Sequence, residues 1–418
     1  MLPMIFRGHS EAGFFARALT LSSDRSPLSL LPGNLRTDDA RYVCIIVVRD
    51  YQRMRTPSRV EARQDWHYTD LDTEILNDAR SGRCVILFDL SNEGPAYDAA
   101  TFLQLYDWIE ANDIPAQRCV WLAQNRAVEQ AAKDHVGERA GLIRFDYYDY
   151  FVKLIAWEFS PSCRQNIPGA DPGAFTERLT DRARKRSLLL CLNATPRLPR
   201  VLTVAALHYY QLIAESIVSF PGLNYVKQGA SWAEVMEFVT RNPTLEYLRS
   251  SLDYIANMPE LKVDNYDEKG NALVTKIDAS VYERSYFSVV TESDFSDGRI
   301  DRVTEKLTKA YCMGHPALLV GNPNSIRFMT TFGFQDWDKV LDRSTELEID
   351  SAARFQVVMR DLLKQVSRIR DDKDRWLQSV SEVTAYNIDH AVSGKFASNY
   401  VSTVEENVVD GLARAIAS

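Results

Sequence analysis

An acid and a base stand side by side at Glu305 and Lys306, in the stretch "RVTEKLTKAYCMGHPALLVGNPNSI" that covers residues 302–326. The spacing of apolar residues predicts a helix here, and Asp301 or Thr304 is suited to cap its first turn. Free N–H groups at a helix start favour phosphate. Lys306 would add a positive charge, and Glu305 could accept hydrogen bonds from paired ribose hydroxyls. The alternative is that both are ordinary first-turn residues on a solvated face.

Further polar residues follow predicted strands in the same half of the chain. Glu292 and Ser293 end the strand "SYFSVVTES", and Arg197 and Arg200 follow the strand "SLLLCLN". Ligands of open α/β sheets bind beyond the carboxyl ends of the strands, where a guanidinium could clamp a diphosphate. The alternative for the arginines is a charged helix start. Asn322, in "GNPNSI", could bind ligand or shape a turn, and the turn is favoured.

Short apolar runs alternate with helical patterns through most of the chain, which is typical of an α/β protein with parallel sheets. Strands are predicted at 42–48, 83–90, 118–124, 141–145, 187–193, 216–220, 285–293 and 317–321. The Pro- and Gly-containing segment 158–186 predicts an interdomain connection. After about residue 345 the strand signals stop, and the remainder is predicted to be helical.

These patterns predict two Rossmann-like domains and a helical extension. The expected boundaries are 1–165 for the first domain, 166–345 for the second, and 346–418 for an extension that packs back across both. No internal repeat or low-complexity segment interrupts this organisation.

The composition is that of a globular protein, with 45% hydrophobic and 25% charged residues. The net charge of −8 argues against a global attraction to nucleic acid or an anionic membrane. The apolar runs are too short to span a bilayer, and the first residues do not resemble a signal peptide. Six scattered cysteines without a CxxC motif indicate reduced thiols in a cytoplasmic protein and no metal site of the chain's own. A divalent ion held mainly by substrate phosphates remains an open alternative.

The segment "FSVVTESDF…RVTEKLTKAYCMGHPALLVGNPNSI" resembles the nucleotide-sugar-binding segment of the α-1,3-fucosyltransferases and their relatives. In that family an aromatic-rich strand ends in Glu-Asn, and "YVTEK" opens the next helix. Glu292, Glu305 and Lys306 match the family residues. Ser293 stands where the family has Asn, and Arg302 where it has Tyr. Both positions contact nucleotide in the family, so the base and the sugar are left open.

The resemblance implies a GT-B glycosyltransferase, in which two Rossmann-like domains face a cleft and the second binds the donor. The donor would be a nucleoside diphosphate sugar, with a GDP-sugar as the leading candidate, and no further cofactor is expected. Fucose or a related hexose would pass to an acceptor hydroxyl with inversion. The donor-binding residues would be Arg197, Arg200, Glu292, Ser293, Arg302, Glu305, Lys306 and Asn322.

Such a transfer needs a base in the first domain that takes the proton of the acceptor hydroxyl. Glu93 and Asp89, in "FDLSNEGPAYD", follow or end a predicted strand, and Glu93 is the preferred base. A helix-capping role is the alternative for Glu93. Asp50 is a reserve candidate, and Gln124 or Asn125 could contact acceptor.

Two other functions stay open at this point. The chain could be a nucleotide-sugar or carbohydrate-binding protein without turnover, given the changes at Ser293 and Arg302. It could also be a transferase that modifies a DNA base, because a local groove can bind DNA despite net negative charge. The sequence does not rank glycan, protein and DNA as acceptors.

Overall fold

Two parallel β-sheets organise the chain in the computed structural model. The structure describes residues 2–6, 14–20, 28–31, 41–48, 71–92, 94, 96–161, 163, 172–223, 232–263 and 278–417. One unit comprises residues 1–153 together with 400–418, and the other comprises residues 154–399. We call them unit 1 and unit 2. The predicted α/β class with two Rossmann-like sheets is therefore confirmed.

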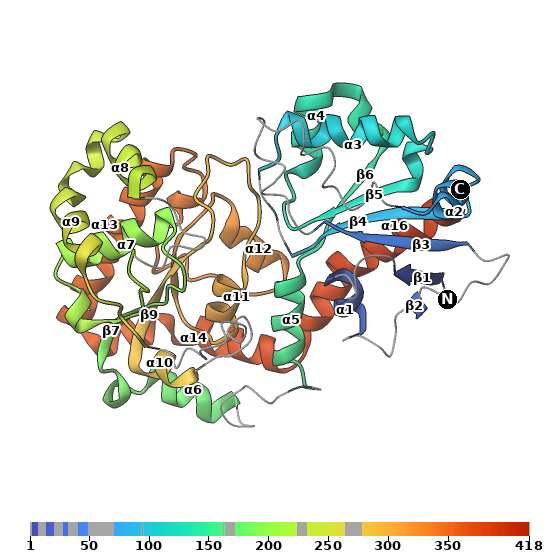
Figure 1. Ribbon diagram of the computed structural model, residues 1–418. Coiled ribbons are helices and arrows are strands. Elements are labelled where there is room, and N and C mark those ends of the chain that lie inside the picture. The colour runs from blue at the N-terminus through green and yellow to red at the C-terminus, as the bar shows by residue number, and fades with distance from the viewer. Residues whose placement is uncertain are drawn as a thin grey trace. The chain divides into compact units, whose positions relative to one another are not determined.

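The sheet of unit 1 has the order β2-β1-β3-β4-β5-β6, with every neighbouring pair parallel (Figure 1). Its strands are β1 (Leu2–Phe6), β2 (Leu28–Leu31), β3 (Tyr42–Val47), β4 (Cys84–Leu90), β5 (Cys119–Ala123) and β6 (Arg144–Tyr147). The helices of this region are α1 (Phe14–Thr20), α2 (Thr73–Arg80), α3 (Ala99–Ala111), α4 (Val128–Val136) and α16 (Glu406–Ala417). The chain passes from unit 1 to unit 2 within α5 (Tyr150–Phe159). The strand order reverses direction between β1 and β3, and the residues that directly follow β1 and β3 lie almost entirely outside the described residues.

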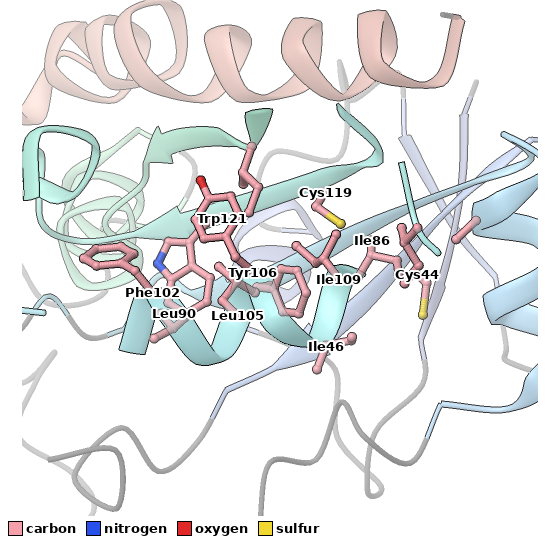
Figure 2. Close-up of a cluster of buried hydrophobic side chains, with 14 of the residues drawn as sticks. Cys44, Ile46, Ile86, Leu90, Phe102, Leu105, Tyr106, Ile109, Cys119 and Trp121 are labelled. Atoms are coloured by element: carbon pink, nitrogen blue, oxygen red, sulfur yellow. The ribbon is translucent and has the colours of Figure 1, made fainter. Parts of the chain in front are cut away.

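The core of unit 1 forms where α3 covers the sheet. Phe102, Leu105, Tyr106 and Ile109 recur at helical spacing and are all buried. Figure 2 shows these side chains gathered with Trp121 of β5. The regular apolar stripe on α3 therefore meets the apolar face of central strands.

The sheet of unit 2 has the order β10-β9-β7-β8 and is also parallel. Its strands are β7 (Ser187–Cys191), β8 (Ile217–Val218), β9 (Ser285–Thr291) and β10 (Ala317–Val320). The helices are α6 (Pro172–Thr180), α7 (Leu198–Tyr209), α8 (Trp232–Arg241), α9 (Arg249–Asn257), α10 (Ala279–Arg284), α11 (Glu305–Cys312), α12 (Ser325–Thr331), α13 (Ser351–Asp371), α14 (Lys373–Val392) and α15 (Lys395–Tyr400). The order reverses between β7 and β9, which makes this pair the topological switch point of the unit.

The structure divides the chain at other places than the sequence suggested. The units separate after Lys153 and not after residue 165. The expected connection 158–186 contains α6, whose Phe175 and Leu179 are buried. The tail 346–418 is not a separate region, because α13 and α14 belong to unit 2 and only residues 400–418 join unit 1.

The C-terminal segment 400–418 is held in unit 1 by buried polar contacts. The Lys153 ammonium lies 2.7 Å from the Glu405 carboxylate, and both side chains are buried. Glu405 ends a π-helical turn, Val401–Glu405, that precedes α16. The last carbonyls of α16 accept hydrogen bonds from Arg118 and Arg41, which satisfies groups that every helix end leaves unpaired. No helix among the described residues is both long and apolar enough to cross a bilayer.

Candidate functional site

The carboxyl ends of the unit 2 strands meet at the switch point between β7 and β9. Asn193, just beyond β7, ties three strand ends together. Its Oδ1 accepts a hydrogen bond from Thr291 Oγ1 at 2.6 Å, and its Nδ2 donates to the Ser219 carbonyl at 3.0 Å. Asn193 is buried, and nothing in the sequence beyond its place after a strand singled it out. It fixes the edge of the sheet on which the predicted residues lie.

Glu292 connects the end of β9 to the start of α11. It is 2% exposed, and its carboxylate accepts hydrogen bonds from both the backbone N–H and the hydroxyl of Thr304. Thr304 is the N-cap residue of α11, and its hydroxyl accepts from the Lys306 N–H. Gly321, at the end of β10, leaves the space that Glu292 occupies, since an added Cβ would lie 2.9 Å from Glu292 Cγ. Glu292 therefore anchors the helix start and is largely withdrawn from solvent.

Glu305 and Lys306 form an ion pair in the first turn of α11. The Lys306 ammonium donates to Glu305 Oε1 at 2.8 Å and to Thr304 Oγ1 at 3.2 Å. The side chains are 16% and 23% exposed, respectively. Burial alone would raise the pKa of Glu305, but the charges of Lys306 and Lys309 and the hydrogen bond from Lys306 lower it to about 2. Glu305 is therefore an ionised acceptor at any physiological pH.

Two arginines converge on Ser293 from the start of α7. Arg197 donates to the Ser293 carbonyl and Arg200 to its hydroxyl, each at 3.4 Å. Arg197 is the N-cap residue of α7, and no side chain caps that helix. The Nε atom of Arg197 is buried and makes no hydrogen bond with the described residues, and none of their carboxylates pairs with this guanidinium. The helix start thus combines positive charge with an unused N–H donor.

Arg302 pairs with Asp294, which directly follows Ser293 beyond the end of β9. The Arg302 Nε lies 2.8 Å from Asp294 Oδ2, and its Nη2 contacts the same oxygen. The Arg302 side chain is 7% exposed and that of Asp294 is 19% exposed. This aspartate therefore holds the arginine that replaces the tyrosine of the resembling family.

The loop between β9 and α11 is fixed by residues distant in sequence. Asn322 Oδ1 accepts hydrogen bonds from Ser296 N at 2.8 Å and Ser296 Oγ at 3.0 Å. Asn322 thus holds the loop after β9, whereas the sequence suggested a role in its own turn at 321–326. Arg354 of α13 is 1% exposed and donates to the carbonyls of Ser296 and Gly321 at 2.6 and 2.8 Å. Arg354 lay in a stretch that the sequence described only as helical.

All eight predicted donor-binding residues therefore lie at the same edge of the unit 2 sheet. They extend over the ends of β7, β9 and β10 and the starts of α7 and α11. Hydrogen bonds link Arg197 and Arg200 to Ser293, and Thr304 connects Glu292 with Lys306. The structure brings these residues together, and their roles toward a ligand stay predictions.

The residues expected to act from the first domain are placed differently. Asp89, in β4, is fully buried, and its two oxygens accept the N–H groups of Phe15 and Ser91 at 3.0 Å each. Glu93 and Asp50 lie outside the described residues. The contacts of Asp89 favour a structural role, because both oxygens already serve backbone amides.

Gln124 and Asn125 are also buried at the end of β5. Gln124 donates to Asp149 Oδ1 at 2.9 Å, and Asn125 Oδ1 accepts from Ala127 N at 3.0 Å near the start of α4. Asp149 in turn exchanges hydrogen bonds with the hydroxyl of Tyr400. These contacts favour internal roles over contact with an acceptor.

His315 and most of the cysteines are buried in the protein interior. His315 is 1% exposed, contacts Ser288 Oγ and the Ser285 carbonyl, and has its pKa lowered to about 3 by burial and by the charge of Lys185. Five of the six cysteines are buried, and all six are free thiols. Among the described residues, no three His, Cys, Asp or Glu side chains are grouped so as to hold a metal ion.

In comparisons with known proteins, the chain matches no protein-family model, and no curated protein sequence matches it significantly. The resemblance to fucosyltransferases therefore depends on the quoted residues alone.

Proposed function

We propose that the chain is a glycosyltransferase of the GT-B type whose unit 2 binds a nucleoside diphosphate sugar. The observation that carries this proposal is the guanidinium of Arg197 at the switch point. A buried N–H without an acceptor costs about 1–3 kcal/mol, and a ligand oxygen would remove that cost. The start of α7, which no side chain caps, adds a favourable dipole for phosphate.

The surrounding side chains are proposed to bind different parts of the donor. Arg197, Arg200 and Lys306 supply positive charge for the diphosphate. Glu305, ionised and accepting, suits the ribose or sugar hydroxyls. Two carboxylates, Glu292 and Glu305, flank the start of α11, so we assign the phosphates to the start of α7 and not to that of α11.

In the proposed reaction, the acceptor oxygen attacks C1 of the donor sugar and the bond from C1 to the diphosphate breaks. The nucleoside diphosphate leaves with the bonding electron pair, and the arginines stabilise its increasing negative charge. A base takes the proton of the acceptor hydroxyl, and Glu93 is the residue that we propose. Asp89 would order the turn after β4 through its hydrogen bond from Ser91 N.

The test combines binding with turnover. A panel of nucleoside diphosphates and their sugar conjugates is screened for a rise in melting temperature, and the best donor is then assayed for release of nucleoside diphosphate with candidate acceptors. We expect Arg197→Ala and Lys306→Ala to abolish the shift. Arg370→Ala, which removes an arginine that is 52% exposed in α13, serves as the control.

Three results separate the alternatives. Binding with turnover supports a transferase. Binding without turnover for any acceptor would indicate a nucleotide-sugar-binding protein, and turnover with DNA alone would indicate a base-modifying enzyme. No shift with any nucleotide would contradict the proposed donor site.

A further inference from the structure

We propose that Asp294 determines donor specificity, with its Oδ1 accepting a hydrogen bond from a neutral N–H or O–H group of the nucleotide sugar. This inference rests on the proposed function, because it concerns the same site at the end of β9. The resemblance assigned no role to this position, and the proposal comes from the geometry of the carboxylate.

The two oxygens of Asp294 are used unequally. Arg302 donates two hydrogen bonds to Oδ2, and Oδ1 accepts none from the described residues. The side chain keeps 19% of its surface exposed, while that of Arg302 keeps only 7%. An arginine that holds one oxygen from the protein side leaves the other available to a ligand in a fixed orientation.

The backbone on both sides of Asp294 is fixed. The preceding carbonyl, of Ser293, accepts a hydrogen bond from Arg197. Two residues further on, Ser296 is held by Asn322 and by Arg354. Because these contacts come from α7, α13 and the turn after β10, the carboxylate is oriented before any ligand arrives. Such preorganisation lowers the entropic cost of binding.

Charge decides which part of the donor can meet Oδ1. A carboxylate only accepts hydrogen bonds and repels a phosphate, so the group that it contacts must be an uncharged donor. Two parts of a nucleotide sugar offer one: the N–H groups of the base and the hydroxyls of the transferred sugar. Both give the same contact at Oδ1, and the experiment distinguishes them.

The experiment compares the intact wild-type chain with Asp294→Asn by calorimetric titration. The ligands are guanosine and uridine diphosphates and their hexose conjugates. The substitution keeps the shape and an oxygen for Arg302 but removes the charge, and we expect affinity to fall by about 10- to 100-fold. Asp297→Asn is the control, because Asp297 lies in the same loop, is 53% exposed and pairs with Arg299.

Each outcome has a defined meaning. A loss already seen with the nucleoside diphosphate supports contact with the base, and a loss limited to the sugar conjugate supports contact with the sugar. Unchanged affinity of Asp294→Asn for every ligand that the wild type binds would overturn this inference and leave the donor site intact. A wild type that binds no ligand would overturn the proposed function as well.

A second variant guards against misfolding. Asp294→Glu keeps the charge that pairs with Arg302 and moves the oxygens outward by one methylene. We expect a change in relative affinity across the ligand panel with an unchanged melting temperature in the absence of ligand. Equal affinities of Asp294→Glu and wild type for all ligands would contradict a specificity role.

Discussion

The two units carry polar residues at the same topological position and use them differently. In unit 1, Asp89 of β4 accepts two backbone N–H groups, and Gln124 after β5 donates to Asp149, whose backbone exchanges hydrogen bonds with Tyr400. In unit 2 the residues after β7 and β9 surround a helix start with positive charge, and Arg197 keeps a donor unused. The end of a strand is a possible binding site. Polar groups there that already have hydrogen-bond partners within the protein indicate a structural role, and polar groups without such partners indicate a role in binding a ligand.

This difference also explains the C-terminal segment. Unit 1 consists of two stretches of chain that are far apart in sequence, and buried charges join them. Unit 2 is one continuous stretch, and its strand-end residues Asn193 and Asn322 hold neighbouring strand ends and loops within that stretch.

The largest effect is expected from breaking the buried ion pair of unit 1. Glu405→Ala leaves the Lys153 ammonium buried without this partner, which should lower the free energy of unfolding by about 3–5 kcal/mol. Urea unfolding measures the change. Glu406→Ala, at the neighbouring exposed position, should change stability by less than about 0.5 kcal/mol. Equal effects of the two variants would show that Glu405 does not hold the segment.

A smaller effect on stability, but a large one on binding, is expected at the end of β10. Gly321→Ala places a methyl group 2.9 Å from Glu292 Cγ and should cost about 1–3 kcal/mol through overpacking. Because Glu292 holds the start of α11, nucleotide binding should weaken too. Gly141→Ala, where an added Cβ meets nothing within 4 Å, is the matched control. If Gly321→Ala binds nucleotide as tightly as the wild type, Glu292 does not contribute to the binding site.

The pH dependence of stability should reveal a buried lysine in unit 2. Burial lowers the pKa of Lys185 to about 7, although Glu283 and Asp181 partly offset this effect. Between pH 7 and about 10, Lys185 is then neutral in the folded chain and protonated in the unfolded chain. Its contribution to stability therefore rises with pH, by at most about 1.4 kcal/mol per unit.

Lys185→Met isolates that contribution. The difference in unfolding free energy between wild type and variant should grow in favour of the wild type from pH 7 to pH 9. Urea unfolding at the two pH values provides the measurement. A difference that is constant or reversed would show that Lys185 keeps its charge in the folded chain.

The smallest effect is expected for an exposed ion pair of unit 2. Arg182 and Asp374 lie 2.6 Å apart, but their side chains are 59% and 65% exposed. Arg182→Ala should change stability by less than about 1 kcal/mol, because solvent screens the pair. A cost comparable with that of Glu405→Ala would remove the contrast between the buried and exposed pairs.

Local patterns predicted much of the fold and brought together the residues of the proposed donor site. The apolar runs that became β4, β5, β7, β9 and β10 were visible because buried parallel strands are almost wholly apolar. The Glu305–Lys306 pair stood out because it lies in the first turn of a predicted helix that is followed by a predicted strand. The arginines after β7 were found by the same strand-end rule.

Contacts between distant segments could not be predicted in this way. Arg354 reaches the loop after β9 from α13, and Tyr400 reaches Asp149 from the other end of the chain. The division of the helical tail between two units also depends on such contacts. The structural role of Asp89 could not be predicted for the same reason, because one of its hydrogen-bond partners is the backbone N–H of Phe15, which is distant in sequence.

Amide hydrogen exchange with and without a nucleoside diphosphate tests the central claim most directly, because it reports both units in one experiment. We expect the ligand to slow exchange in peptides that cover residues 193–200 and 292–306 of unit 2. Peptides covering residues 84–92 and 119–125 of unit 1 should be unchanged. Protection confined to the unit 1 peptides, or no protection at a ligand concentration that saturates binding, would contradict the assignment of the donor site to unit 2.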